Sequence, residues 1–315
     1  MGAADKISKS FGSGLAASAP AALVKALRPQ QWVKNALVFL PFLFAIEQAW
    51  SLDNLDPVPE LIGKLFIVFA GYCALSAAVY LFNDLSDRKA DQQHPVKKHR
   101  PIASGKVGVP MAVTVMVALT AAGLAATFLV ELVLGGIGLI YLAINVAYSL
   151  GLKRIVLVDV MAVASGYVIR AVAGAVAIDV TPSPWLYATT AAAALFIVVG
   201  RRYAEVRLAG DEASEQRSVL GKYAGPFISQ LLTITATAAW LSYTLYTVEA
   251  DNLPQNNTML LTIPLVSFGL FRYLYLLNTS KEAEAPEQLI MRDVPLVLSI
   301  VGWIVAAVLV LILND

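Results

Sequence analysis

The sequence predicts an all-α integral membrane protein with nine transmembrane helices, and three observations support this fold class. First, 58% of the 315 residues are hydrophobic and only 14% are charged, with a mean hydropathy of +0.69, whereas soluble domains carry about 25% charged residues. Second, apolar stretches recur near the ~20 residues that cross a bilayer. Third, every second connection between these stretches carries lysine and arginine, and the connections between those carry none. A soluble or nucleic-acid-binding protein is therefore not expected.

The nine expected spans are defined by their apolar composition and by the loops between them. They cover residues 36–48, 61–82, 109–130, 132–150, 157–178, 185–201, 226–248, 258–277 and 294–313. Basic residues fill the N-terminal arm and the loops after spans two, four, six and eight, and are absent from the other loops. The positive-inside rule then places the N-terminus and the basic loops in the cytoplasm and the C-terminus outside.

The domain organisation follows from the same reading. Residues 1–27 hold Lys6 and Lys9 before an Ala-rich stretch with too much Gly, Ser and Pro for a signal peptide, so we expect a flexible cytoplasmic N-terminal arm. Residues 28–315 form one transmembrane domain. The single cysteine, Cys73, excludes a disulfide framework and a cysteine-based metal site. Small residues in spans five and six permit close helix packing or contact between subunits of a homo-oligomer.

The segment that leaves span two carries the strongest chemical signal. If its helix continues past Phe82, one face presents the polar residues Tyr80, Asn83, Asp84, Asp87 and Asp91. Carboxylates on one face repel each other unless a cation lies between them. Hard oxygen ligands suit Mg²⁺, which completes its shell with substrate phosphate. The pattern predicts a magnesium–diphosphate site at the cytoplasmic mouth of the helix, with the three aspartates as catalytic carboxylates and Asn83 as a further metal ligand.

Basic residues near this mouth are candidate phosphate ligands. Lys97 and Arg100 follow the aspartates and are expected to bind the rest of a polyphosphate. Lys34, beside Trp32, is either an interfacial anchor or a phosphate ligand. Lys153, after span four, is either part of a helix cap and orientation signal or a second phosphate clamp.

Arg170 lies about twelve residues into span five, roughly 18 Å from its cytoplasmic end. An arginine at the bilayer centre costs about 2.5–3.5 kcal/mol, so it needs a partner or a wet cavity. Asp159, Val163 and Gly166 lie on the same helical face, which predicts a polar cleft in which Arg170 binds substrate. Pairing of Arg170 with backbone carbonyls is the structural alternative.

The cytoplasmic end of span six reads Arg201-Arg202-Tyr-Ala-Glu205. Arg201 and Glu205 are four residues apart, so an exposed ion pair along one helix is the simple interpretation. The position of this segment opposite the aspartate-rich loop favours a role of Arg201, Arg202 and Glu205 in substrate binding.

Two segments, Asn83-Asp84-x-x-Asp87-x-x-x-Asp91 and Lys98-His-Arg100-Pro101-Ile-Ala-Ser-Gly105, resemble the first signature of the UbiA-type intramembrane prenyltransferase superfamily. The resemblance implies a bundle of nine helices with cytoplasmic active-site loops. It also implies Mg²⁺ as cofactor on the aspartate-rich loops, where a prenyl diphosphate is ionised. The family usually carries a second Asp-x-x-x-Asp motif after span six. Here arginines largely replace those acids, which points to a substrate with more than one phosphate group.

One branch of this family is similar in further segments: Arg28-Pro-Gln-Gln-Trp-Val-Lys34-Asn35, His94-Pro-Val-Lys97, Tyr148-Ser-Leu-Gly-Leu-Lys153 and Arg201-Arg202-Tyr-Ala-Glu205. Its enzymes transfer 5-phosphoribose from phosphoribosyl diphosphate to decaprenyl phosphate, for cell-wall arabinan synthesis at the bacterial inner membrane. The resemblance implies that Lys34, Tyr80, Lys97, Arg100 and Arg202 contact the donor. Lys153 and Arg170 would hold the lipid phosphate. The alternatives are a conventional prenyltransferase acting on a quinone or haem acceptor and a polyprenyl-phosphate or anion transporter.

Overall fold

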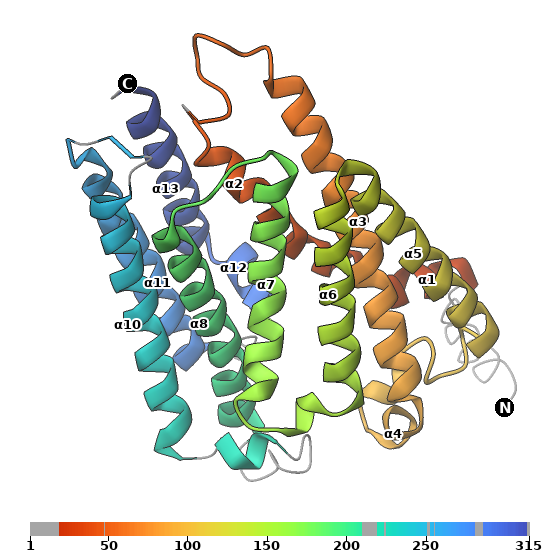
Figure 1. The fold of residues 1–315 in the computed structure, drawn as a ribbon. Helices are drawn as coiled ribbons and strands as arrows, with labels where there is room; N and C mark the ends of the chain where they lie inside the picture. Colours follow the sequence, from red (N-terminus) through yellow and green to blue (C-terminus); the bar gives the residue numbers. More distant parts are fainter. Residues whose placement is uncertain are drawn as a thin grey trace, which may run out of the picture.

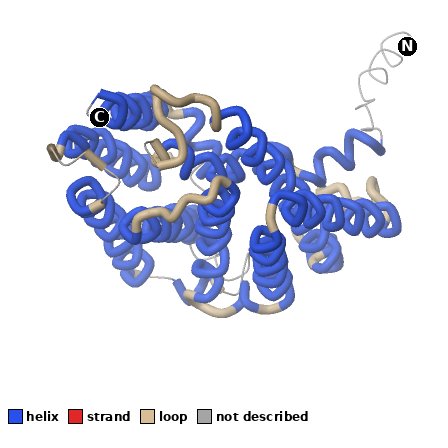
Figure 2. The backbone as a smooth tube through the Cα atoms, turned by 45° about the horizontal axis from the view of Figure 1, so that its top comes forward, coloured by secondary structure: helices blue, strands red, loops and turns tan. Residues whose placement is uncertain are grey.

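The computed structural model describes residues 19–46, 48–209, 219–223, 225–250, 253–254, 256–280 and 286–313, and this part of the chain is helical without a β-strand (Figures 1 and 2). The all-α fold class is confirmed. The elements are α1 (Ala19–Leu27), η1 (Pro29–Phe39), α2 (Leu40–Leu43), α3 (Val58–Ser86), α4 (Arg88–Gln93), η2 (Lys97–His99), α5 (Val109–Val130), α6 (Leu132–Leu150), η3 (Leu152–Arg154), α7 (Val158–Ala177), α8 (Pro184–Ala209), η5 (Leu220–Tyr223), α10 (Pro226–Glu249), η6 (Thr258–Thr262), α11 (Ile263–Thr279), α12 (Pro286–Arg292) and α13 (Val294–Leu313).

Seven helical segments in the described residues are long and apolar enough to cross a membrane. They correspond to spans two to six, eight and nine. The expected span 226–248 forms α10, which has 24 residues but is rich in serine and threonine and is not among the seven. The expected span 36–48 is not one helix. It is divided between the 3₁₀ segment η1 and the four-residue α2, with Pro41 in the first turn of α2. The count of nine spans and the orientation of the termini therefore stay predictions.

The helices form two groups joined in the middle of the molecule (Figure 1). The helices α3, α5 and α6 lie on one side, α10, α11 and α13 lie on the other, and α7 and α8 pack against each other between them. Gly123 lets α5 approach α3 closely, because a Cβ at this position would lie 2.9 Å from the carbonyl oxygen of Gly71. Small residues at such crossings are typical of helix packing in membranes.

The segment η1 is fixed against α7 by an even closer approach. A Cβ at Gly174 would lie 2.0 Å from the carbonyl oxygen of Val38, so only glycine fits there. This contact brings Lys34 and Asn35 of η1 to the centre of the molecule, next to the middle of α7.

The expected flexible arm, residues 1–27, ends in the helix α1. Ala22 and Ala26, one turn apart, are buried in a cluster with Leu81 of α3 and Ala112 of α5. Small side chains at this spacing let α1 lie close to both helices, so the last nine residues of that segment are helical and packed. Residues 1–18, including Lys6 and Lys9, lie outside the described residues.

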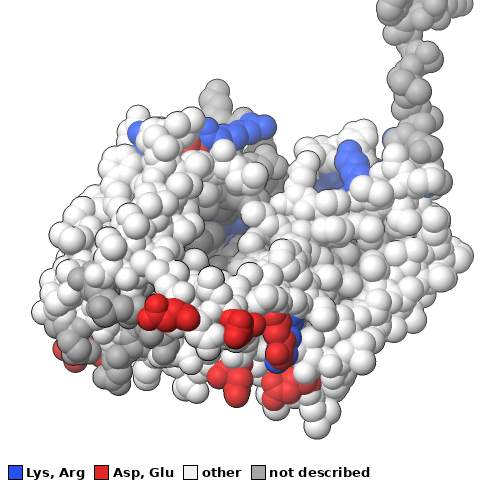
Figure 3. Space-filling model, turned by 90° about the horizontal axis from the view of Figure 1, so that it is seen from above, with Lys and Arg blue, Asp and Glu red and all other residues white. Residues whose placement is uncertain are grey.

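Charged side chains are unevenly distributed on the end of the molecule that lies opposite α4. The space-filling view shows acidic side chains along one edge of this face and Lys and Arg side chains along the opposite edge (Figure 3). A hollow opens between the two groups of helices, and basic side chains are visible within it. The space between the two halves is therefore suited to anionic groups.

Candidate active site

The aspartate-rich segment does not continue as one helix, as the sequence pattern assumed. The helix α3 ends at Ser86, Asp87 has non-helical dihedral angles, and the short helix α4 starts at Arg88. The three carboxylates do not converge on one point: Asp84 and Asp91 bind Arg100, whereas Asp87 binds Lys153. Within the described ranges, no group of three or more acidic, histidine or cysteine side chains is close enough to hold a metal ion.

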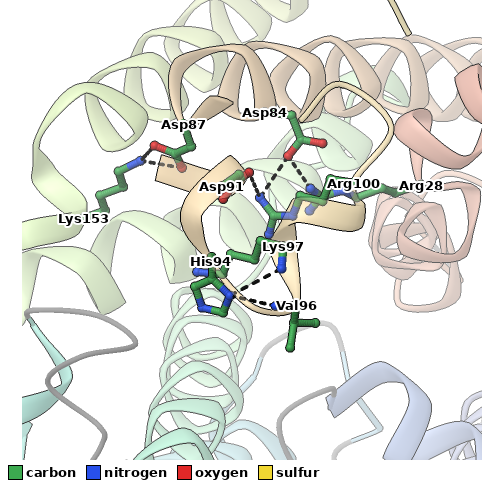
Figure 4. A network of polar contacts seen from close by, with 9 residues as sticks. All are labelled: Arg28, Asp84, Asp87, Asp91, His94, Val96, Lys97, Arg100 and Lys153. Atoms are coloured by element: carbon green, nitrogen blue, oxygen red, sulfur yellow. Dashed lines mark hydrogen bonds and ion pairs between the residues drawn. The ribbon is translucent and has the colours of Figure 1, made fainter. Parts of the chain in front are cut away.

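Asp84 and Asp91 are held together by one guanidinium group (Figure 4). Nη1 of Arg100 lies 2.8 Å from Oδ2 of Asp91 and 3.2 Å from Oδ1 of Asp84. Nη2 of Arg28 donates to the same Asp84 oxygen at 2.6 Å, and its guanidinium group lies 5.1 Å from the centre of the Tyr80 ring. Both carboxylates are buried. Two arginines balancing two buried carboxylates form a stable arrangement, because each charge has a hydrogen-bonded partner.

Asp87 points away from this pair and towards η3. Nζ of Lys153 donates to its two carboxylate oxygens at 2.6 and 2.8 Å (Figure 4). The ammonium group of Lys153 therefore neutralises the predicted central metal ligand.

Asn83 is the predicted ligand whose acceptor oxygen is unused. Its Oδ1 is buried and, in the described part of the chain, accepts no hydrogen bond. A buried acceptor without a donor costs free energy, which a bound cation removes. Amide and carboxylate oxygens are also the donor types that Mg²⁺ prefers. The residues thus fit a magnesium ion chemically, on condition that the carboxylates exchange Arg100 and Lys153 for the metal.

The loop after α4 is ordered by a histidine side chain. Nδ1 of His94 accepts hydrogen bonds from the backbone N–H groups of Val96 and Lys97, at 3.2 and 3.3 Å. Only an unprotonated Nδ1 can accept them. Partial burial and the nearby Lys97 lower the pKa of His94, which favours this form. The loop geometry places Lys97 and Arg100 beside the carboxylates.

A second polar cluster joins α7, α8 and η5. Nε of Arg202 donates to Oδ2 of Asp159 at 2.8 Å, and the hydroxyl group of Tyr223 donates to Oδ1 at 2.5 Å. Burial, together with the hydrogen bond to Asp159, raises the pKa of Tyr223. Glu205 accepts from Arg202 at 2.5 Å and from Arg201 at 3.0 Å. The arginines of this segment are therefore held in place by acids of the same cluster, and the pairing of Arg201 with Glu205 is confirmed.

Asp159, on the same face of α7 as Arg170, is bound by Arg202 and Tyr223. The expected polar cleft in which Arg170 binds substrate stays a prediction. The guanidinium group of Arg170 donates to Asn35 at 2.6 Å, to the carbonyl of Gly166 at 2.5 Å, to Ser76 at 3.1 Å and to Tyr141 at 3.0 Å. Among the described residues, none of its partners is a carboxylate. Arg170 is 5% exposed and ties together η1, α3, α6 and α7.

Sequence reasoning missed Asn35, Ser76 and Tyr141 as partners of Arg170 and Tyr223 as a partner of Asp159. The signal for the first three was a polar side chain in a segment otherwise fit to cross the membrane, which requires a polar partner there. Tyr223 lies between the expected spans six and seven, and its sequence neighbours gave no signal.

Two apolar cavities share part of their lining. One, of ≈ 320 Å³, is bordered by Lys34 and Tyr167 and continues among apolar side chains of η1, α2 and α8. The other, of ≈ 260 Å³, lies between α8, α10, α11 and α13. Both are lined by Ala193, Ile197 and Trp303. Nζ of Lys34 lies 6.0 Å from the centre of the Tyr167 ring. A cation therefore borders the apolar cavity of ≈ 320 Å³, which is called the apolar chamber below.

Residues 37–292 match the UbiA prenyltransferase family, and the chain belongs to that family. The chain is 36% identical over 284 residues to decaprenyl-phosphate phosphoribosyltransferase of Mycobacterium tuberculosis, covering 90% of this chain and 92% of that protein. It is 32% identical over 294 residues to the protein of the same name from Corynebacterium glutamicum, covering 91% and 86%. The family resemblance expected from the motifs is confirmed.

Solved structures show the same fold. A UbiA homolog from Archaeoglobus fulgidus bound to GPP and Mg²⁺ has a TM-score of 0.66 and 17% identity, covering 92% of this chain and 99% of that one. A digeranylgeranylglyceryl phosphate synthase has a TM-score of 0.64 and 15% identity, covering 93% and 99%. The chain is thus an integral membrane protein with the helical arrangement of this family.

Proposed function

We propose that this protein transfers 5-phosphoribose from 5-phosphoribosyl 1-diphosphate to decaprenyl phosphate, or a similar polyprenyl phosphate, and releases diphosphate. The observation that carries the proposal is the identity of 32–36% to decaprenyl-phosphate phosphoribosyltransferases over about 90% of the chain. The basic character of the α8 segment supports it, because this donor carries a 5-phosphate in addition to its diphosphate. The product would serve arabinan synthesis, with the reaction on the cytoplasmic side of the plasma membrane.

The donor diphosphate is assigned to the mouth formed by the ends of α3 and α8. Asn83, Asp87 and Asp91, with Asp84 behind them, would hold Mg²⁺, which when bound neutralises charge on the departing diphosphate. Arg100 and Lys153 now bind these carboxylates. Once released from them, both cations can bind phosphate oxygens. We therefore expect the metal and the donor to bind cooperatively, because each favours the same exchange of partners.

The cations on α8 complete the donor site in this proposal. Arg201, in the second half of α8, is 42% exposed, and Glu205 orients its guanidinium group. Arg202 is buried and tied to Asp159, so it contributes a fixed positive charge. We assign Lys97 and Tyr80 to the same donor site. A fixed cluster of cations stabilises the diphosphate as its bond to the sugar lengthens, without reorganising during the reaction.

The acceptor is assigned to the apolar cavities. The polyprenyl chain would lie against Ala193, Ile197 and Trp303, with the phosphate near Lys34. A phosphate monoester loses its second proton near pH 6, so its oxygen attacks without a general base. The bond between this oxygen and C1 of the ribose forms while the bond from C1 to diphosphate breaks, with inversion at C1. Arg170, saturated by protein acceptors, would act by fixing η1 and so placing Lys34.

Purified protein in liposomes tests the proposal. Labelled phosphoribosyl diphosphate and decaprenyl phosphate should yield labelled lipid in a reaction that requires Mg²⁺. Consumption of a prenyl diphosphate with a quinone acceptor, and no labelled lipid from the first pair, would instead assign conventional prenyl transfer. No turnover of either substrate pair, combined with uptake of polyprenyl phosphate or anions, would assign transport.

A further inference from the structure

A cavity of ≈ 820 Å³ adjoins the candidate active site, between the N-terminal helix and the loop after α4, and Asp84 and Arg100 belong to its lining. Its walls come from α1, from the start of η1, from the end of α3 and from the loop up to Pro101. It shares no lining residue with the apolar chamber that contains Lys34. The described chain therefore has a second large opening next to the carboxylates, on the side of Arg28.

Three cations border this second cavity: Lys25, Arg28 and Arg100. Asp84 is the acid on its wall, and it is 2% exposed because both arginines already bind it. Arg28 uses one nitrogen for this contact, and Arg100 uses one nitrogen for Asp84 and Asp91. The other nitrogens of each guanidinium group donate to no acceptor within the described ranges. The cavity thus presents free N–H donors and positive charge.

Arg28 is held in a costly conformation that faces this cavity. Its dihedral angles, φ 52° and ψ 59°, lie in the left-handed region that a non-glycine residue rarely adopts. Strained residues of this kind persist where the surrounding structure fixes them, and they concentrate at sites that bind ligands. Here the ion pair with Asp84 and the stacking on Tyr80 fix the guanidinium group before any ligand arrives.

The rim of the cavity is apolar. Val24 on α1 is 54% exposed and Val96 on the loop is 73% exposed, and both line the opening. A cationic interior with exposed valines at its edge suits a ligand that has an anionic head and an apolar body. Arginine pairs with phosphate through two parallel hydrogen bonds, which makes phosphate the matching anion.

We propose that this cavity binds a phosphate group beside the proposed donor site, with Arg28 and Lys25 as its own ligands and Arg100 on the border of the two sites. The apolar rim favours the phosphodiester of an anionic membrane lipid as its source over free phosphate from water. Arg28 and Lys25 have no part in the proposed transfer reaction, so this proposal and that reaction can fail separately.

Binding to the full-length purified protein in detergent tests the proposal, without donor or acceptor present. Dihexanoyl phosphatidylglycerol, dihexanoyl phosphatidylcholine and inorganic phosphate are each titrated by calorimetry. The variant Lys25→Glu reverses one exposed charge in the cavity, and Lys106→Glu reverses an exposed charge outside it. We expect phosphatidylglycerol to bind about fivefold or more weakly to Lys25→Glu, the factor that one basic residue contributes near anionic lipid, and unchanged to Lys106→Glu. Arg28→Lys, which keeps the charge but lacks the planar guanidinium group, should also weaken the binding of phosphatidylglycerol.

The remaining outcomes decide between sources or reject the site. If inorganic phosphate binds, phosphatidylglycerol does not, and Lys25→Glu weakens the binding, the phosphate site is supported. Its ligand would then be free phosphate from solution and not a lipid. Equal binding of phosphatidylcholine, equal loss in Lys106→Glu, or no binding of either phosphate would overturn the proposal. Because turnover is not measured, these outcomes are independent of the transfer assay.

Discussion

Lys153, in the turn after α6, places its ammonium group 2.6 and 2.8 Å from the two carboxylate oxygens of Asp87 at the end of α3. The two residues are 66 positions apart in the sequence. Their contact means that a cation of the protein occupies the oxygens expected to bind magnesium. A metal ion and the ammonium group of Lys153 are then competitors, and the donor phosphates are the alternative partner that Lys153 gains.

Removing the competitor should strengthen metal binding. In Lys153→Met, Asp87 has no ammonium group to displace, so we expect Mn²⁺ to bind more tightly, by about tenfold, to the protein without donor. Electron paramagnetic resonance of added Mn²⁺ measures this. Turnover should fall in the same variant, since a phosphate ligand is lost. Lys89→Met, which removes an exposed lysine on α4, is the matched control, and an unchanged Mn²⁺ affinity in Lys153→Met would refute the competition.

Asp87→Asn should abolish most activity without unfolding the protein. The amide keeps the size of the side chain but lacks the charge that a divalent ion needs, so we expect turnover to fall by about 100-fold or more. Metal binding should weaken in parallel, and the unfolding temperature in detergent should change little. Full activity of this variant would exclude a metal-binding role of Asp87.

The cluster around Asp159 should contribute strongly to stability. Asp159→Ala leaves the buried Arg202 without this counter-charge and Tyr223 without its acceptor, which should cost about 3–5 kcal/mol. Tyr223→Phe removes one hydrogen bond and should cost about 1–2 kcal/mol. Thermal unfolding in detergent, monitored by the fluorescence of a dye that does not react with thiols, measures the unfolding temperatures. Asp159→Ala should have a lower unfolding temperature than Tyr223→Phe. Equal unfolding temperatures for both variants and the parent would contradict this assignment.

Arg170→Leu should destabilise the protein, because Asn35, Ser76 and Tyr141 lose a common donor. Each buried group left unsatisfied costs about 1–3 kcal/mol. Since Asn35 adjoins Lys34, we also expect a higher KM for the lipid acceptor and an unchanged KM for the donor. Arg170→Lys serves as the comparison that keeps the charge. If Arg170→Leu retained the parent's stability while acceptor use fell, Arg170 would instead be a direct ligand of the lipid phosphate.

The loop after α4 should loosen at acidic pH. The pKa of His94 is lowered in the folded protein, so the folded loop favours neutral histidine. Its stabilising contribution is present above the unfolded pKa of about 6.5 and is lost as the pH falls through the lower folded value. Hydrogen exchange at the amides of Val96 and Lys97 should show protection factors that fall between pH 7.5 and pH 5. Protection factors independent of pH would show that Nδ1 does not hold the loop.

Hydrophobic periodicity and the distribution of charge were sufficient to predict the fold class and the clustering of the polar loops. The helices around Val68 and Leu139 could be predicted from local sequence alone, because a membrane helix satisfies its own backbone hydrogen bonds. The aspartates and Arg100 could be assigned to one region, since they are neighbours along the chain. The family relationship was visible in the same short segments.

The partners of the buried charges could not be predicted in this way. Asp159 and Arg170 share a helical face of α7, yet Asp159 binds Arg202, 43 residues away, and Arg170 binds Asn35, 135 residues away. Such choices depend on how α7 is rotated between η1 and α8, which helical periodicity does not determine. The contact of Asp87 with Lys153 was missed for a related reason, because Lys153 belongs to a turn 66 residues away.

Mass spectrometry of the lipid fraction, after the purified protein in liposomes has received decaprenyl phosphate, phosphoribosyl diphosphate and Mg²⁺, tests the central claim most directly. We predict a lipid heavier than decaprenyl phosphate by one phosphoribosyl group, formed together with one diphosphate and absent when Asp87→Asn replaces the parent. Unchanged decaprenyl phosphate beside active prenyl transfer from a prenyl diphosphate would contradict the account.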